Sequence, residues 1–234
     1  MADPFAETLS PFTSAPGPVR QLRGLAVAAA VCIALSVFAS GALSWTQWLE
    51  YRVAADFAAG TATLAEAYTA DRLSGILRWV VAALTVLDAA VFLGWLWRAR
   101  LNAESLSLSV HRLGRGWVVG AWICPIVNLW YPLILLADIW KTSRPGRTAT
   151  LDLAKVRGSR LVTTWWVLSV LAGFVTFYAT TKLLVPVTAD DLYRGWRDYL
   201  IASGTRAIAA ILLVFVIAHH HLAQCAHRVR PVTS

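Results

Sequence analysis

A single carboxylate stands inside a long apolar stretch of this sequence. Asp88 is the one ionisable residue between Trp79 and Trp97. If that stretch is a spanning helix, Asp88 lies about 13 Å from Trp97 along the axis, near the middle of a bilayer. A charged carboxylate there costs roughly 2.5–3.5 kcal/mol on insertion scales, which protonation or a hydrogen-bond donor reduces. Three roles stay open: a hydrogen bond between packed helices, a proton or ion relay, and catalysis.

A second polar residue, Asn128, is framed by prolines. Pro125 and Pro132 lie seven residues apart on either side of it. Proline removes a backbone N–H donor and clashes with the preceding turn, so a continuous helix through this segment is unfavourable. The Asn128 amide either closes a turn of the chain at this point or contacts a ligand there.

Histidines and cysteines near the C-terminus include a workable pair of metal ligands. His221 and Cys225 lie one helical turn apart, which suits two ligands of one ion. Adjacent histidines in the run His219–His221 point to different faces of a helix, however, so a polar helix end at the membrane interface explains them better. We therefore expect no metal and no cofactor. The cysteines are far apart in the chain and are expected to be free thiols: Cys32, Cys124 and Cys225.

Motifs of the common enzyme classes are absent from the sequence. It contains no P-loop, no dinucleotide-binding glycine pattern, no Gly-x-Ser-x-Gly elbow and no His-Glu-x-x-His. No apolar stretch carries the paired acids that an intramembrane hydrolase or a metal-dependent transferase would use. We expect no catalytic residues and no enzymatic activity.

Composition places these residues in a membrane. Of 234 residues 58% are hydrophobic and 15% charged, and the mean hydropathy is +0.59. These values exclude a disordered chain, a disulfide-rich scaffold and a water-soluble fold. Apolar runs of about 20 residues can cross a hydrocarbon core as helices. We expect an all-α integral membrane protein with one transmembrane domain over 24–228, preceded by a disordered, proline-rich cytoplasmic tail (1–23) and followed by a short tail (229–234).

The distribution of basic residues indicates which apolar stretches cross the membrane. Lysine and arginine gather in cytoplasmic loops near span ends, and ten of the 21 lie in 98–160. If 116–140 enters and returns, all basic segments share the cytoplasm with both termini, and the acid-rich loops 49–75 and 183–204 lie outside. We therefore predict a bundle of four spanning helices plus a proline-broken re-entrant or interfacial helical hairpin (116–140). A kinked fifth span stays the alternative. The predicted spans are 24–48, 76–97, 161–183 and 205–226.

This arrangement brings the two polar residues to a similar depth in the membrane. Asn128 follows Gly116 by twelve residues, so a hairpin that dips into the membrane carries it inward. Unpaired polar groups are costly in hydrocarbon. We predict that Asp88 and Asn128 face one interior polar site, bridged by a hydroxyl such as Thr164 or Ser169. The re-entrant segment itself is shaped by Pro125, Trp130 and Pro132.

The segment 95–140 reads WLWRARLNAESLSLSVHRLGRGWVVGAWICPIVNLWYPLILLADIW. It resembles the actinobacterial multi-pass membrane family called domain of unknown function 4328. The resemblance rests on the Pro-x-x-Asn-Leu-Trp-x-Pro core over 125–132 and on flanking residues: Trp97, Arg100, Asn102, Gly116, Trp117, Gly120, Trp122, Asp138, Ile139, Trp140 and the Trp165–Trp166 pair. It implies a bacterial integral membrane protein and supplies no catalytic residues. Asp88 and His219–His221 lie outside the pattern.

Two functions fit these expectations. The first is a non-enzymatic scaffold or accessory subunit of the bacterial cell membrane, whose basic cytoplasmic face binds anionic lipid or a partner protein. The lipid-facing basic residues would be Arg98, Arg100, Arg112 and Arg115. The alternative is a small transporter or proton-conducting protein that uses Asp88, in which Asp88→Asn abolishes flux while a scaffold is barely disturbed. The basic segment lacks interleaved aromatic residues away from the membrane, so no nucleic acid is expected as a partner.

The topology can be tested with single cysteines in a cysteine-free version of the chain. An impermeant thiol reagent should label Gly60→Cys and Asp190→Cys from outside the cell, because both positions lie in segments poor in basic residues. Thr150→Cys should react only after the membrane is opened. Labelling of position 150 from outside would establish the five-span alternative instead.

Overall fold

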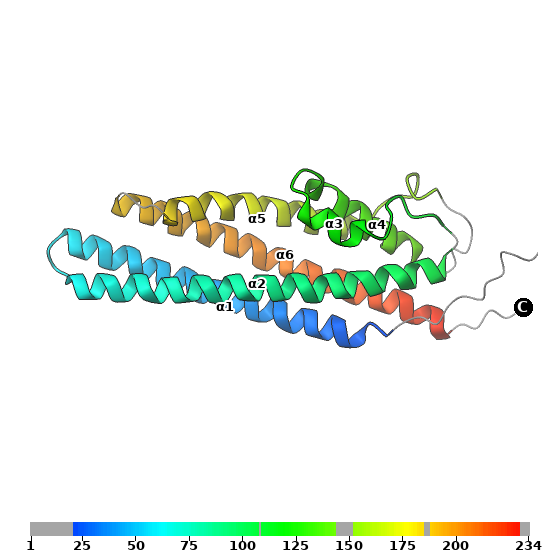
Figure 1. Cartoon of the computed structure of the whole chain (residues 1–234), viewed down its shortest axis with the longest axis horizontal. Coiled ribbons are helices and arrows are strands. Elements are labelled where there is room, and N and C mark those ends of the chain that lie inside the picture. Colours follow the sequence, from blue (N-terminus) through cyan, green and yellow to red (C-terminus); the bar gives the residue numbers. More distant parts are fainter. Residues whose placement is uncertain (1–20, 108, 144–151, 185–187, 230–234) are drawn as a thin grey trace, which may run out of the picture.

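A computed structural model of the chain describes residues 21–107, 109–143, 152–184 and 188–229 (Figure 1). The described residues form helices and contain no strand, which confirms the all-α fold class. The helices are α1 (Arg23–Ala58), α2 (Leu64–Leu106), α3 (Trp117–Ile123), a 3-10 turn η1 (Val127–Leu129), α4 (Tyr131–Thr142), α5 (Arg160–Leu184) and α6 (Ala189–Val229). The predicted disorder of the N-terminal tail concerns residues 1–20, which lie outside the described residues.

Four helices are long and apolar enough to cross a membrane, as predicted: α1, α2, α5 and α6. α1 and α2 pack as one antiparallel hairpin, α5 and α6 pack as another, and α1 packs along α6. The order across the bundle is therefore α2, α1, α6, α5, and the outer pair α2 and α5 hardly touch. The turn between α1 and α2 lies at the same end of the bundle as the end of α5 and the start of α6, and we call this end the hairpin end (Figure 1). The other end, where α2 and α6 finish, is the cap end.

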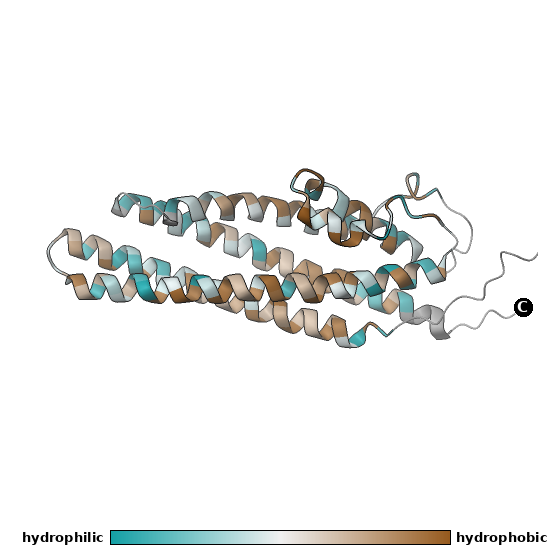
Figure 2. Ribbon diagram, viewed as in Figure 1, coloured by the Kyte–Doolittle hydropathy of each residue, from teal (hydrophilic) through white to brown (hydrophobic). Residues whose placement is uncertain are grey.

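The long helices extend well beyond the predicted spans. α2 has 43 residues and α6 has 41; at 1.5 Å per residue each is about 60–65 Å long, roughly twice the thickness of a hydrocarbon core. The prediction of loops over 49–75 and 183–204 is wrong, because α1 continues to Ala58 and α6 already begins at Ala189. Figure 2 shows apolar residues along the middle of these helices and hydrophilic residues gathered towards the ends.

A short turn at the hairpin end replaces the first of these loops. Gly60 adopts φ +75°, a backbone conformation that glycine tolerates without strain. Thr63 then caps α2: its backbone N–H donates to Glu66 Oε2 at 2.7 Å, and the Glu66 N–H donates to Thr63 Oγ1 at 3.3 Å. This reciprocal capping box satisfies two N–H groups at the start of the helix. Local signals thus start α2 twelve residues before the predicted span.

The segment 116–140 forms the helical hairpin α3–η1–α4. It lies against α2 and α5 near the cap end and returns to that end (Figure 1). α3 has seven residues and α4 has twelve, too few to cross a hydrocarbon core. Pro132 occupies the first turn of α4, where its missing N–H breaks no helical bond. Re-entry into the membrane stays a prediction, which the tip residues Ile123 and Ile126 support because they are 74% and 71% exposed.

The main apolar core lies in the cap half of the bundle. Residues from six helices meet there, among them Phe92, Leu96, Leu136, Trp165 and Val216. In the hairpin half only a small cluster is buried, around Leu43, Val81 and Tyr199. The packing therefore loosens from the cap end towards the hairpin end.

Candidate functional site

A cleft lies between α2 and α5, the two long helices that hardly pack against each other. It consists of two adjoining cavities of about 320 and 610 Å³. Each cavity is lined by residues of α1, α2, α5 and α6. Two residues, Thr85 and Arg206, belong to the lining of both cavities. All four of these helices are candidate membrane spans.

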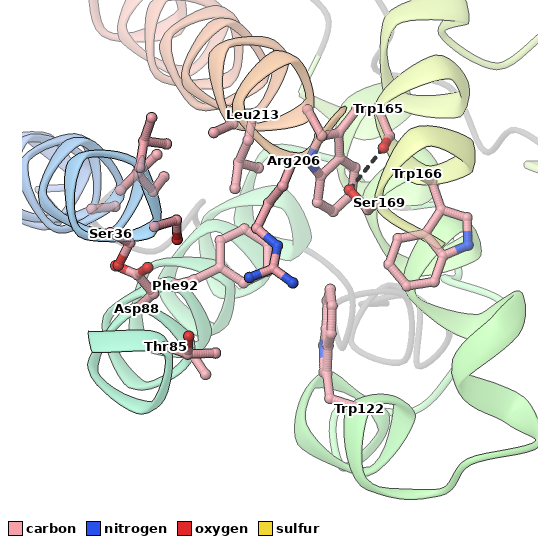
Figure 3. A pocket seen from close by; sticks show the side chains of 17 residues that line it. Ser36, Thr85, Asp88, Phe92, Trp122, Trp165, Trp166, Ser169, Arg206 and Leu213 are labelled. Atoms are coloured by element: carbon pink, nitrogen blue, oxygen red, sulfur yellow. Dashed lines mark hydrogen bonds between the residues drawn. The ribbon is translucent and has the colours of Figure 1, made fainter. Parts of the chain in front are cut away.

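Aromatic side chains close the cleft at its cap end (Figure 3). Phe92 of α2 meets Trp122 of α3 edge-on with ring centroids 5.4 Å apart, and Trp122 meets Trp166 of α5 at 5.6 Å. The Trp166 Nε1–H donates to the carbonyl oxygen of Leu129 at 2.8 Å, which fixes the tip of the hairpin to α5. The short hairpin thus fills, at the cap end, the space that stays open further along the bundle.

Asp88 lies on the wall of the first cavity. It projects from α2, and Ser36 of α1 lies beside its carboxyl group (Figure 3). The other lining residues near it are mainly apolar, such as Ala89 and Phe92. The sequence analysis therefore found a residue that faces an interior space.

Arg206 is the residue of this site that the sequence analysis missed. It points into the cavity from α6 (Figure 3), and its Nη2 donates to Thr176 Oγ1 of α5 at 2.8 Å. None of the ion pairs among the described residues includes Arg206. The sequence analysis did not select it because it lies at the edge of an apolar run. The cavity therefore carries one acidic and one basic group on different walls.

A polar stripe runs along α1 towards the hairpin end, formed by Ser36, Ser40, Ser44 and Gln47. The spacings of four, four and three residues keep these side chains on one helix face. Ser40, Ser44 and Gln47 are buried, and neither Ser44 Oγ nor Gln47 Oε1 has a hydrogen-bond partner. Buried oxygens of this kind normally bind water or another polar group. The stripe could have been found in sequence, where only charged residues were counted.

Asn128 lies in η1 and does not line either cavity; the hairpin contributes Trp122 instead. The polar site shared by Asp88 and Asn128 stays a prediction. The suggested bridging hydroxyls give it no support: Thr164 is exposed, and the Ser169 hydroxyl donates to the Trp165 carbonyl oxygen at 2.8 Å.

The basic residue Arg100 does not face lipid, contrary to the prediction. It is only 4% exposed, and its Nε donates to Glu104 Oε1 at 2.7 Å while its Nη2 donates to the Leu113 carbonyl oxygen at 2.8 Å. Arg115 binds the other oxygen of Glu104. Charge counting predicts that a segment is basic but not which of its charges are paired inside the protein. Lipid contact stays a prediction for Arg98, Arg112 and Arg115.

Arg112 also has an internal partner. Its Nη2 and Nε donate to Asp138 Oδ1 at 2.6 and 2.9 Å, and its backbone N–H donates to Oδ2 at 3.1 Å. Asp138 is fully buried. This ion pair holds the loop before α3 against α4, so it secures both sides of the hairpin.

A buried amide network joins α6 to the same region. Asn102 Nδ2 donates to Gln224 Oε1 at 3.0 Å, and Gln224 Nε2 donates to Ser143 Oγ at 3.0 Å. Arg100, Asn102 and Asp138, on which the family resemblance partly rests, thus build the cap end. They position the hairpin that closes the cleft.

His220 does not belong to the polar interface end that was predicted for the histidine run: it is 1% exposed and packs edge-on against Trp95. His219 is exposed and stacks on Trp140, and His221 is half-buried, so for these two the prediction stays open. No group of three potential metal ligands gathers among the described residues. Cys32 and Cys124 are free thiols, and the side chains of Cys225 and His227 lie outside the described residues.

Comparison with known proteins identifies the family. The model of the family described as Domain of unknown function (DUF4328) matches residues 58–221. The chain belongs to this family. The DUF4328 match includes Asp88, Arg206 and the whole hairpin, while the polar stripe of α1 lies entirely before it. No curated protein and no solved structure matches the chain. Membership of DUF4328 therefore establishes the family and leaves the function to be argued from the cleft.

The ion pair at the cap end should dominate the stability of the hairpin. Asp138→Asn should lower the free energy of unfolding by about 1.5–3 kcal/mol, because it removes charged hydrogen bonds from a buried position. Thermal unfolding of the purified protein in detergent measures the effect. Asp152→Asn is the matched control, since Asp152 is exposed, pairs with the neighbouring Lys155 at 3.3 Å and accepts the Ala154 N–H at 3.0 Å; it should change little. Equal unfolding temperatures for the two variants would contradict the assignment.

Proposed function

We propose that this DUF4328 protein is a non-enzymatic transport protein that binds a small amphiphilic molecule between α2 and α5. The observation that carries the proposal is an apolar cavity, facing the membrane, with Asp88 and Arg206 on its walls. An apolar cavity with a few polar groups suits a ligand that is largely apolar. Asp88 and Arg206 carry opposite charges, so they suit a ligand whose polar head has both a positive and a negative charge.

The cost of the two charged groups supports this proposal over a purely structural role. Charged side chains inside membrane spans raise the free energy of insertion and normally face an interior or a water-filled space. Among the described residues, the Thr176 hydroxyl is the one side-chain group that accepts a hydrogen bond from Arg206. A ligand with complementary charge offsets this cost, whereas a scaffold needs neither group.

The closure of the cleft at one end supports transport in particular. The aromatic cluster of Phe92, Trp122 and Trp166 separates the cavity from the cap end. A carrier exposes its site to one side of the membrane at a time, so a site blocked on one side is the expected form of one end state. The excess of basic residues near the cap end supports placing that end and both termini in the cytoplasm of a bacterial cell.

Proton conduction is a second candidate, and the polar stripe of α1 favours it. Ser40, Ser44 and Gln47 lead from the hairpin half towards Ser36, which lies beside Asp88. Hydroxyls and water along this stripe would bring protons to the carboxyl group. The scaffold or accessory-subunit role, with anionic lipid or a partner protein on the basic face, ranks below both because it makes no use of the cleft.

Binding can be tested with lysophosphatidylethanolamine, a single-chain amphiphile whose head carries both charges. Asp88→Asn and Arg206→Gln should each reduce its retention about tenfold or more, because a hydrogen bond to a charged group contributes about 1.5–3 kcal/mol. Native mass spectrometry of the full chain released from mild detergent counts the bound amphiphile. The exposed pair Asp190 and Arg194 on α6 provides controls, Asp190→Asn and Arg194→Gln, which should retain it normally. Equal retention by all four variants would refute the cleft as the binding site.

Proton flux separates the two candidates. In proteoliposomes containing a pH-sensitive dye, a proton-conducting protein should acidify the lumen without any amphiphile, and Asp88→Asn should abolish that signal. Arg206→Gln should leave proton flux largely intact, since the guanidinium does not exchange protons near neutral pH. A signal that survives Asp88→Asn would exclude Asp88 from the proton path.

A further inference from the structure

A polar pocket lies at the cap end, outside the cleft. It forms where residues 109–115 fold back on the last turns of α2. Its volume is about 310 Å³. Polar side chains form much of its lining: Arg100, Glu104, Ser107, Ser109, His111 and Arg115. The pocket is separate from both cavities of the cleft, with which it shares no lining residue.

The pocket contains hydrogen-bond donors that the protein leaves unused. Arg100 is 4% exposed. Its Nε donates to Glu104 and its Nη2 to the Leu113 carbonyl oxygen, but its buried Nη1 has no partner among the described residues. Both ring nitrogens of His111 are buried without a partner as well. A buried guanidinium N–H without an acceptor is costly, so these groups indicate a missing acceptor.

The balance of charge shows what kind of acceptor is missing. Among the described residues that line the pocket, Arg100 and Arg115 face one acid, Glu104, which leaves one net positive charge. Burial and the nearby Arg100 lower the pKa of His111 to about 4, so its ring is neutral at pH 7 and offers one N–H donor. An anion with several acceptor oxygens fits this environment.

We propose that this pocket binds a phosphate group. Arg100 Nη1 and the His111 ring hold it from the buried side, and Arg115 covers it from solvent, where its side chain is 62% exposed. A phosphate accepts hydrogen bonds from several directions at once, which suits donors on different walls, and arginine binds it strongly. The phosphate belongs either to a lipid headgroup at the membrane surface or to a free solute. This proposal does not rest on transport through the cleft.

The test uses the full chain in phosphatidylcholine nanodiscs, titrated with inorganic phosphate by calorimetry. A second set of nanodiscs contains phosphatidic acid, and its retention is measured by native mass spectrometry. His111→Phe removes the ring nitrogens at similar size, and Arg115→Gln removes an exposed charge that is not required for the fold. Each should weaken phosphate binding about tenfold. Arg157→Gln, at an exposed position of the loop before α5, is the control for non-specific charge and should bind normally.

Glu104→Gln distinguishes a binding site from a structural cluster. It removes the one negative charge of the pocket, so phosphate should bind several-fold more tightly even though internal hydrogen bonds are weakened. Binding of inorganic phosphate alone assigns the site to a solute, and retention of phosphatidic acid alone assigns it to a headgroup; either supports the proposal. Absence of both, or an equal loss in Arg157→Gln, overturns it.

Discussion

The contact of Trp122 with Phe92 and Trp166 determines how the two helical hairpins stand relative to each other. α2 and α5 are at opposite ends of the packing order and hardly meet directly. At the cap end the α3–η1–α4 hairpin fills the space between them, and its Trp122 ring contacts both helices. Large aromatic rings bury much apolar area in a defined geometry. The cleft is therefore the part of this gap that the hairpin is too short to fill.

Polar groups on the two sides of this aromatic cluster differ in how completely they are hydrogen-bonded. At the cap end, Asp138 accepts hydrogen bonds from the Nε, the Nη2 and the backbone N–H of Arg112, and Gln224 bonds to both α2 and the end of α4. Such a satisfied network makes a region rigid and specific. On the other side, Gln47 lines the cleft and Ser44 lies in the same polar stripe of α1; among the described residues neither Ser44 Oγ nor Gln47 Oε1 has a hydrogen-bond partner, and Arg206 has no acidic partner. The cap end is therefore the part of the molecule that holds its shape, and the cleft is the part suited to binding.

Much of the fold follows from sequence, because hydropathy and the distribution of basic residues report directly on membrane crossing. Four spans and a proline-broken hairpin were predicted from them, and Asp88 was recognised because charge is rare in an apolar run. The same reasoning gave no weight to the uncharged polar residues of the first span, so it missed the stripe through Ser40 and Gln47. It also placed Arg100 at the surface, since a charge that pairs with Glu104 looks the same in sequence as a free one. Contacts between distant segments decide these points.

The length of the outer helices has a mechanical consequence. α2 continues as one helix of 43 residues from the hairpin end to the cap end, a stiff rod about 65 Å long. Its firm attachment is near the cap end, through Phe92, Arg100 and Asn102, while its other half has few buried contacts. Such a rod acts as a lever with its pivot near one end. The far tip at Leu64 lies 28 residues from Phe92, or about 42 Å. A tilt of about 5° at Phe92 moves this tip by about 4 Å, so small rearrangements around Trp122 are amplified into a larger change in the width of the distant opening.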